Sequence, residues 1–173
     1  VAYCNPKKAL FRINRDQRFA RERPPYKTTF SAAITASGLK KPSQGGGPAY
    51  YFHIDESGQL LTAAGEYRPP ADRLLALRKH VVGDPGGFSK VLKDKRFDAV
   101  YSGLQQEDKL VRLPKGFDEN APHQDALKLK SFIAWREVSA RKLQPAALPG
   151  VLLEDFRAAL PLVKWLRGAG PTP

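Results

Sequence analysis

The chain has 173 residues, 42% hydrophobic and 27% charged, which is the composition of a globular rather than a disordered protein. Lys and Arg number 29 against 17 Asp and Glu, so the net charge is +12 and favours polyanionic partners. The single cysteine, Cys4, excludes an internal disulfide and a multi-cysteine metal site. No apolar run reaches the roughly 18 residues of a membrane span. We therefore expect one cytoplasmic domain over residues 1–173 that contacts no membrane.

The positive charge is concentrated in the first quarter of the chain. Residues 1–41 contain ten basic and two acidic side chains, a net +8 out of the +12 of the whole chain. A polyanionic partner is therefore expected to contact this segment.

The first part of the chain is predicted to be rich in strands. Phe11 and Ile13 alternate with polar residues, and this period of two predicts a half-buried strand over Ala9–Arg15. A basic loop follows, broken by Pro24 and Pro25. The further elements predicted in this part are a strand over Thr28–Ala36, a glycine-containing loop over Ser37–Pro48, and a hairpin of Ala49–Asp55 with Gln59–Glu66.

Helices are predicted to dominate the rest of the chain. Pro69 and Pro70 open a helix that ends at the glycine-rich stretch 83–87. The further predicted elements are a short helix over Phe88–Lys95, a hairpin over Ala99–Leu113, a helix over Gln124–Lys130, a strand over Phe132–Val138, and a helix over Leu148–Leu166 that Pro161 bends or divides. Early strands and later helices predict an α+β fold with a mostly antiparallel sheet and helices mainly on one face.

A cluster of basic and aromatic residues is the clearest candidate for a ligand site. Arginine forks bind phosphate bidentately, and tyrosine and histidine rings offer stacking faces and proton donors. The predicted ligand-binding residues are Arg12, Asn14, Arg15, Asp16, Arg18, Tyr26, Lys27, Tyr51 and His53. Two structural alternatives stay open: Arg12 and Asp16 could pair to pin the loop to the strand, or the arginines could only solvate a sheet edge.

Asp16 and His53 are the candidates for proton transfer. In the predicted hairpin Tyr50, Phe52 and Ile54 share the core face, so His53 lies on the other face. A histidine there can act as a general acid or base, although a plain hydrogen-bonding role is the alternative.

The remaining residues give no sign of a cofactor. The three histidines are scattered without the spacing of metal ligands, so we expect neither a metal nor a cofactor. Trp135 and Trp165 are interpreted as core residues rather than as stacking platforms for bases.

Several motifs in order along the chain resemble a widespread bacterial and fungal family, the domain of unknown function numbered twenty-four sixty-one. The resemblance rests on Pro6 to Asp16, Pro25-Tyr26-Lys27-Thr28, Tyr50-Tyr51-Phe52-His53, Pro114-Lys115-Gly116-Phe117 and Trp165-Leu166. It implies that Arg12, Asp16, Arg18, Tyr26, Lys27 and His53 lie in the family's signature stretches, and it implies no reaction. Members begin with additional helical sequence, and this chain contains no Met. We therefore expect a truncated start and an uncovered apolar face near the first strand.

Three functions follow from these observations. The first is a binding domain for a phosphate-rich or other anionic ligand, with nucleic acid as one form of it. The second is an enzyme acting on a phosphorylated or anionic small molecule, with Asp16 or His53 handling protons. The third is a non-catalytic protein-interaction domain, which an uncovered apolar patch beside the basic cluster would favour.

Overall fold

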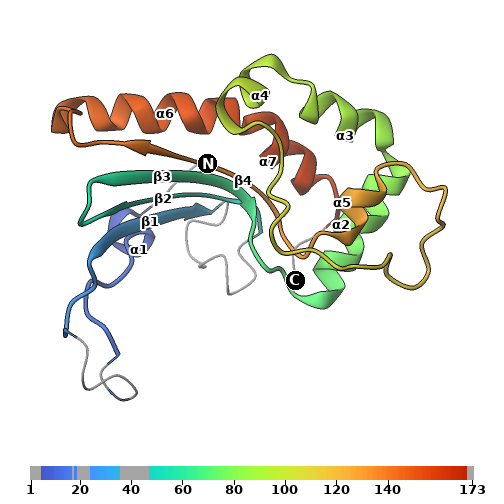
Figure 1. Cartoon of the computed structure of the whole chain (residues 1–173), viewed down its shortest axis with the longest axis horizontal. Helices are drawn as coiled ribbons and strands as arrows, with labels where there is room; N and C mark the ends of the chain where they lie inside the picture. Colours follow the sequence, from blue (N-terminus) through green and yellow to red (C-terminus); the bar gives the residue numbers. More distant parts are fainter. Residues whose placement is uncertain (1–4, 17, 19–23, 36–46, 171–173) are drawn as a thin grey trace.

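The fold was analysed in a computed structural model that describes residues 5–16, 18, 24–35 and 47–170. Four antiparallel strands form one sheet in the order β1-β2-β3-β4. The strands are β1 (Thr29–Thr35), β2 (Ala49–Asp55), β3 (Gln59–Glu66) and β4 (Phe132–Ser139). Long helices cover one face of this sheet, and the short helix α1 (Pro6–Ala9) lies on the other side (Figure 1). The predicted α+β fold with a mostly antiparallel sheet and helices mainly on one face is confirmed.

The helices follow in three groups along the chain. The helices between β3 and β4 are α2 (Ala71–Gly83), α3 (Pro85–Leu92), α4 (Lys95–Tyr101) and α5 (Gln124–Lys128). A 3-10 turn, η2 (Pro145–Ala147), leads into α6 (Leu148–Ala158) and α7 (Leu160–Arg167). The predicted helix of residues 148–166 is therefore divided next to Pro161, as expected from a proline that lacks a backbone N–H. No helix in the described ranges is both long and apolar enough to cross a bilayer.

The hydrophobic core lies between the sheet and the helices. Tyr50 on β2 packs against Phe156 on α6 with ring centroids 5.0 Å apart. The interior also includes a buried polar network in which Asp155 accepts hydrogen bonds from Thr62 and Arg136. Burial raises the pKa of the Tyr101 hydroxyl, which donates to the backbone of Asp155. The predicted core face of β2 is thus the face that meets the helices.

Two predicted elements are wrong. Residues 9–15 do not form a strand, because Asn5 caps a helical turn beginning at Pro6 and only isolated bridges follow, Leu10 with Ala32 and Asn14 with Tyr26. The predicted hairpin over 99–113 is also absent from the described residues: its first residues belong to α4, which buries Phe97 and Tyr101 one helical turn apart. The glycine-containing loop predicted over 37–48 lies outside the described residues except for 47 and 48, as does Cys4.

Candidate functional site

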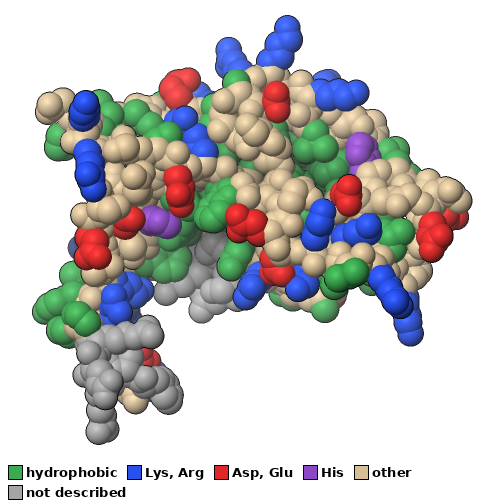
Figure 2. Space-filling model, viewed as in Figure 1, with side chains coloured by type: hydrophobic (Ala, Val, Ile, Leu, Met, Phe, Trp, Pro, Cys, Tyr) green, Lys and Arg blue, Asp and Glu red, His purple; other side chains and the backbone are tan. Residues whose placement is uncertain are grey.

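A groove of about 600 Å³ lies on the sheet face opposite the long helices. The strand register explains its shape. Tyr51, Ala63 and Trp135 occupy one cross-strand row of β2, β3 and β4, and Ala49, Gly65 and Ile133 occupy the next. The central strand therefore contributes only small side chains to the middle of these rows, whereas Tyr51, Trp135 and Ile133 on its neighbours are larger. Figure 2 shows hydrophobic side chains gathered in the hollow below the strands, with charged side chains along its border.

Aromatic rings form one wall of the groove. Phe11 meets Tyr51 edge-on with centroids 6.0 Å apart, and Tyr51 meets His53 edge-on at 5.7 Å. The Tyr51 hydroxyl and His53 Nδ1 are 3.3 Å apart. Trp135 forms the opposite wall. Neighbouring strands lie about 4.8 Å apart, so the positions of Tyr51 and Trp135, two strands apart, are separated by about 10 Å.

The far end of the groove carries Arg68 in an unusual backbone conformation. Its φ of 44° is in the left-handed region, which costs a non-glycine residue free energy. The Arg68 backbone N–H donates to Ser131 Oγ at 2.9 Å, and its guanidinium donates to Asp108 at 3.1 Å. It also lies 5.5 Å from the centre of the Tyr67 ring. These contacts hold a solvent-accessible cation at the groove mouth.

Asp108 ties this end of the groove to a second cation. Lys130 Nζ donates to Asp108 at 2.8 Å, and together with Arg68 it holds the pKa of the Asp108 carboxyl below its usual range. If Arg68 turned toward an anionic ligand, Asp108 would keep Lys130 as its partner. A movement of Arg68 from Asp108 to the ligand therefore leaves the Asp108 carboxylate paired with Lys130.

The basic N-terminal segment continues directly from the groove wall. Phe11 is followed by exposed Arg12, and the Arg15 guanidinium donates to the carbonyl of Tyr26 at 3.0 Å. Asn14 pairs with Tyr26 in an isolated bridge, and Tyr26 itself is 60% exposed. Lys27 is exposed as well.

The two acid–base candidates lie in different places. Asp16 accepts from Arg18 at 2.5 Å in an exposed turn, and this bond holds the pKa of the carboxyl below its usual value. His53 lines the groove beside Tyr51, whereas Asp16 is not among the groove residues. The structure thus brings Tyr51 and His53 together and leaves Arg12, Asn14, Arg15, Asp16, Arg18, Tyr26 and Lys27 in the flanking segment.

Phe11, Arg68 and Trp135 are among the groove residues that sequence reasoning missed. Trp165 is buried as predicted, but Trp135 is not a core residue, because its position in β4 puts it on the helix-free face. The alternation of residues 132–138 already places Trp135 on the opposite face from Phe132 and Ala134, so the sequence did contain a signal for its position. What the sequence lacked was the register that sets Trp135 opposite Tyr51. Among the described residues, no three His, Cys, Asp or Glu side chains approach closely enough to hold a metal.

This geometry defines the protein as an α+β domain with an aromatic-walled groove on the open face of its sheet. The chain belongs to the family described as conserved hypothetical protein (DUF2461), whose model matches residues 1–165. No curated protein and no solved structure matches the chain.

Proposed function

We propose that this protein is a binding domain for a phosphate-bearing ligand with a flat ring, and that single-stranded nucleic acid is its ligand class. The observation that carries the proposal is the row of Tyr51, Ala63 and Trp135 on the helix-free face. Stacking of a base on an aromatic ring contributes about 1–3 kcal/mol and tolerates any base, because every base has a π-face.

Cations lie at both ends of the groove, where they would contact the phosphates of a nucleic-acid strand whose bases stack on the aromatic rings. Arg68 stands at one end, with 65% of its side chain exposed. At the other end the chain leaves Phe11 into the segment of Arg12, Arg15 and Lys27. Single strands are bound by this combination of stacking platforms and phosphate contacts, whereas a duplex hides its ring faces.

The test is a fluorescence-anisotropy titration with a labelled 12-nucleotide DNA strand at 50 mM salt. Replacing Trp135 or Tyr51 with Ala should each weaken binding about tenfold, since 1.4 kcal/mol corresponds to a factor of ten. Phe30→Ala is the matched control, because Phe30 is 48% exposed but lies on the other face of the sheet. No detectable binding by the unaltered protein, or equal losses for Trp135→Ala and Phe30→Ala, would overturn the proposal.

Salt dependence tests the phosphate contacts separately. Each contact contributes about 0.7 to the slope of log affinity against log salt for a single strand. Arg68→Gln should reduce the slope by roughly one contact, whereas Lys164→Gln on the helix side of the sheet should not change it. An unchanged slope for Arg68→Gln would remove Arg68 from the phosphate contacts.

Exposed apolar side chains in and near β1 favour a second candidate function, a protein-interaction domain. Leu10, Ile13, Tyr26 and Phe30 are 41%, 53%, 60% and 48% exposed, and all lie in or beside β1. Self-association is the direct test of this function: sedimentation velocity at increasing protein concentration should show a dimer that Ile13→Ser removes. A monomer at all concentrations would exclude this form of the second function.

A further inference from the structure

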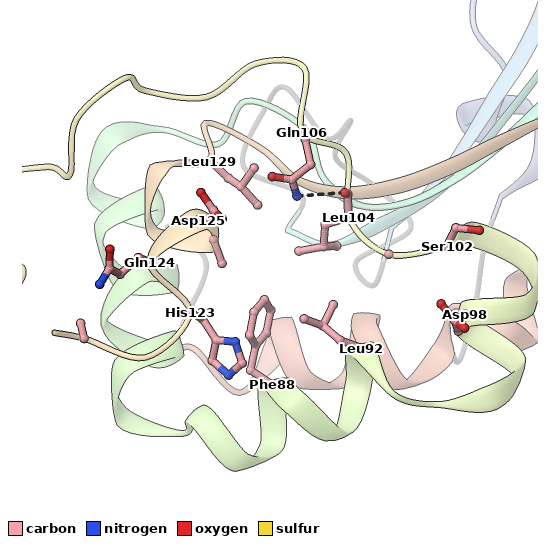
Figure 3. Close-up of a pocket in the computed structure, with 13 residues that line it drawn as sticks. Phe88, Leu92, Asp98, Ser102, Leu104, Gln106, His123, Gln124, Asp125 and Leu129 are labelled. Carbon is pink, nitrogen blue, oxygen red and sulfur yellow. Dashed lines mark hydrogen bonds between the residues drawn. The ribbon is translucent and has the colours of Figure 1, made fainter. Parts of the chain in front are cut away.

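A second pocket, of about 670 Å³, lies on the helical side of the molecule, away from the groove. Its lining comes from α3, from the end of α4 and the turn after it, and from α5 with the residues before it. Figure 3 shows the side chains of Phe88 and Leu92 on one side of the space and those of Leu104 and Leu129 on the other. No groove residue takes part in this lining.

The interior of the pocket is apolar and belongs to the packed core. Phe88 and Leu129 are each 1% exposed and Leu104 is 9% exposed, so these side chains are held by their neighbours. The half-buried Leu92 and Ala121 give the pocket accessible apolar surface, and polar side chains make up about half of the lining. A pocket of this size suits a small organic molecule that carries a polar head group.

The charges at the pocket are negative, although the whole chain carries +12. Two carboxylates line it, Asp98 and Asp125, and they stand on opposite sides of the space (Figure 3). No Lys or Arg is among the lining residues. Lys109 and Lys128 approach Asp125 only at 3.7 and 3.9 Å, and within the described part of the chain no cation forms an ion pair with Asp98. The pocket therefore presents an available carboxylate beside an apolar surface.

His123 makes the wall beside Asp125 rigid. Its Nε2 lies 2.9 Å from Ser89 Oγ and 3.1 Å from the carbonyl oxygen of Pro85, and its ring meets Phe88 edge-on. A ring nitrogen that faces a carbonyl oxygen donates its proton, so Nε2 acts as a donor here. This nitrogen is consequently not a base for Ser89, and the Ser89–His123 pair does not form a hydrolytic nucleophile. The contacts instead fix the pocket wall.

We propose that this pocket binds a small organic cation, a primary ammonium group carried on an apolar body. The apolar body would lie against the half-buried Leu92 and Ala121, and the ammonium group would pair with Asp98. Charge complementarity selects this ligand: an anion would face two carboxylates, and a neutral apolar molecule would leave Asp98 unpaired.

Three probes with the same body and different head groups test the proposal: 4-phenylbutylamine, 4-phenylbutanol and 4-phenylbutyrate. Calorimetric titration at pH 7 should show the amine binding at least fivefold more tightly than the alcohol and the carboxylate binding most weakly. Asp98→Asn should abolish the preference for the amine while the alcohol still binds. Ala121→Phe, which fills the pocket, should remove binding of both.

Two controls locate the effect. Asp118→Asn changes an exposed acid outside the pocket, and Trp135→Ala changes the groove; neither should alter amine binding. Equal affinity for amine and carboxylate, or an amine preference that survives Asp98→Asn, would overturn the proposal. Because the two sites share no lining residue and Trp135→Ala changes the groove alone, failure here leaves the proposal of nucleic-acid binding untouched.

Discussion

The guanidinium of Arg73 and the carboxylate of Glu66 lie 2.5 Å apart, with 1% and 4% of their side chains exposed. Arg73 also donates to the carbonyl of Leu166 at the end of α7 and to that of Gly170. The pair therefore links the end of β3, helix α2 and the end of the last helix. A buried ion pair with additional hydrogen bonds is tolerated because each polar atom has a partner.

Removal of one member of this pair should strongly destabilise the protein. Glu66→Ala leaves the Arg73 charge buried without a carboxylate, which costs about 3–5 kcal/mol. Urea denaturation followed by circular dichroism measures this change in the free energy of unfolding. Arg157→Ala is the matched control, because its pair with Glu154 is exposed and should contribute less than about 1 kcal/mol. A loss below 1 kcal/mol for Glu66→Ala would contradict the assigned role.

Gly65 should not tolerate a side chain. Its φ is 129°, and a Cβ atom there would lie 2.1 Å from the carbonyl oxygen of Phe132 on the neighbouring strand. Gly65→Ala is therefore expected to lower the free energy of unfolding by about 2 kcal/mol or more. Gly150→Ala on α6 meets no atom within 4 Å and should be neutral or stabilising by about 0.5–1 kcal/mol. Similar effects at the two positions would argue against this strand geometry.

Asp84 should make stability depend on pH in the acid range. The backbone N–H of Gly87 and the indole N–H of Trp165 donate to its carboxylate, and these bonds hold its pKa below the usual 3.8. A lowered folded-state pKa means that the stabilisation is complete above the unfolded value and disappears as the pH falls through the folded value. The difference in unfolding free energy between the unaltered protein and Asp84→Asn should thus shrink between pH 5 and pH 2. A difference independent of pH would contradict the assignment.

Two adjacent alanines on β3 should respond differently to the same substitution. Ala63 forms the floor of the groove between Tyr51 and Trp135, so Ala63→Leu should weaken oligonucleotide binding about tenfold or more. Ala64 belongs to the core on the other face, so Ala64→Leu should cost about 1–3 kcal/mol through overpacking. Anisotropy and urea denaturation of both variants provide the comparison. If a folded Ala63→Leu variant binds the oligonucleotide as tightly as the unaltered protein, the groove is excluded as the ligand position.

Local patterns determined much of this protein. Alternation and turn residues defined the hairpin of β2 and β3 with its boundaries and put Tyr50 and His53 on opposite faces. Prolines and glycines marked where α2 begins and ends, and Pro161 marked the division between the last two helices. The sequence predicts these features because the side-chain period of a strand or a helix recurs within a few residues, and because proline and glycine affect the backbone at their own positions.

Tertiary structure decided the composition of the candidate site. Residues 9–15 alternate like a strand but find only isolated partners, so helix capping by Asn5 and the bridges to Ala32 and Tyr26 determine their path. Trp135 faces Tyr51 only because both strands pair with β3, across more than 80 residues of chain. Register between distant strands depends on the packing of the whole sheet, which no short-range period encodes.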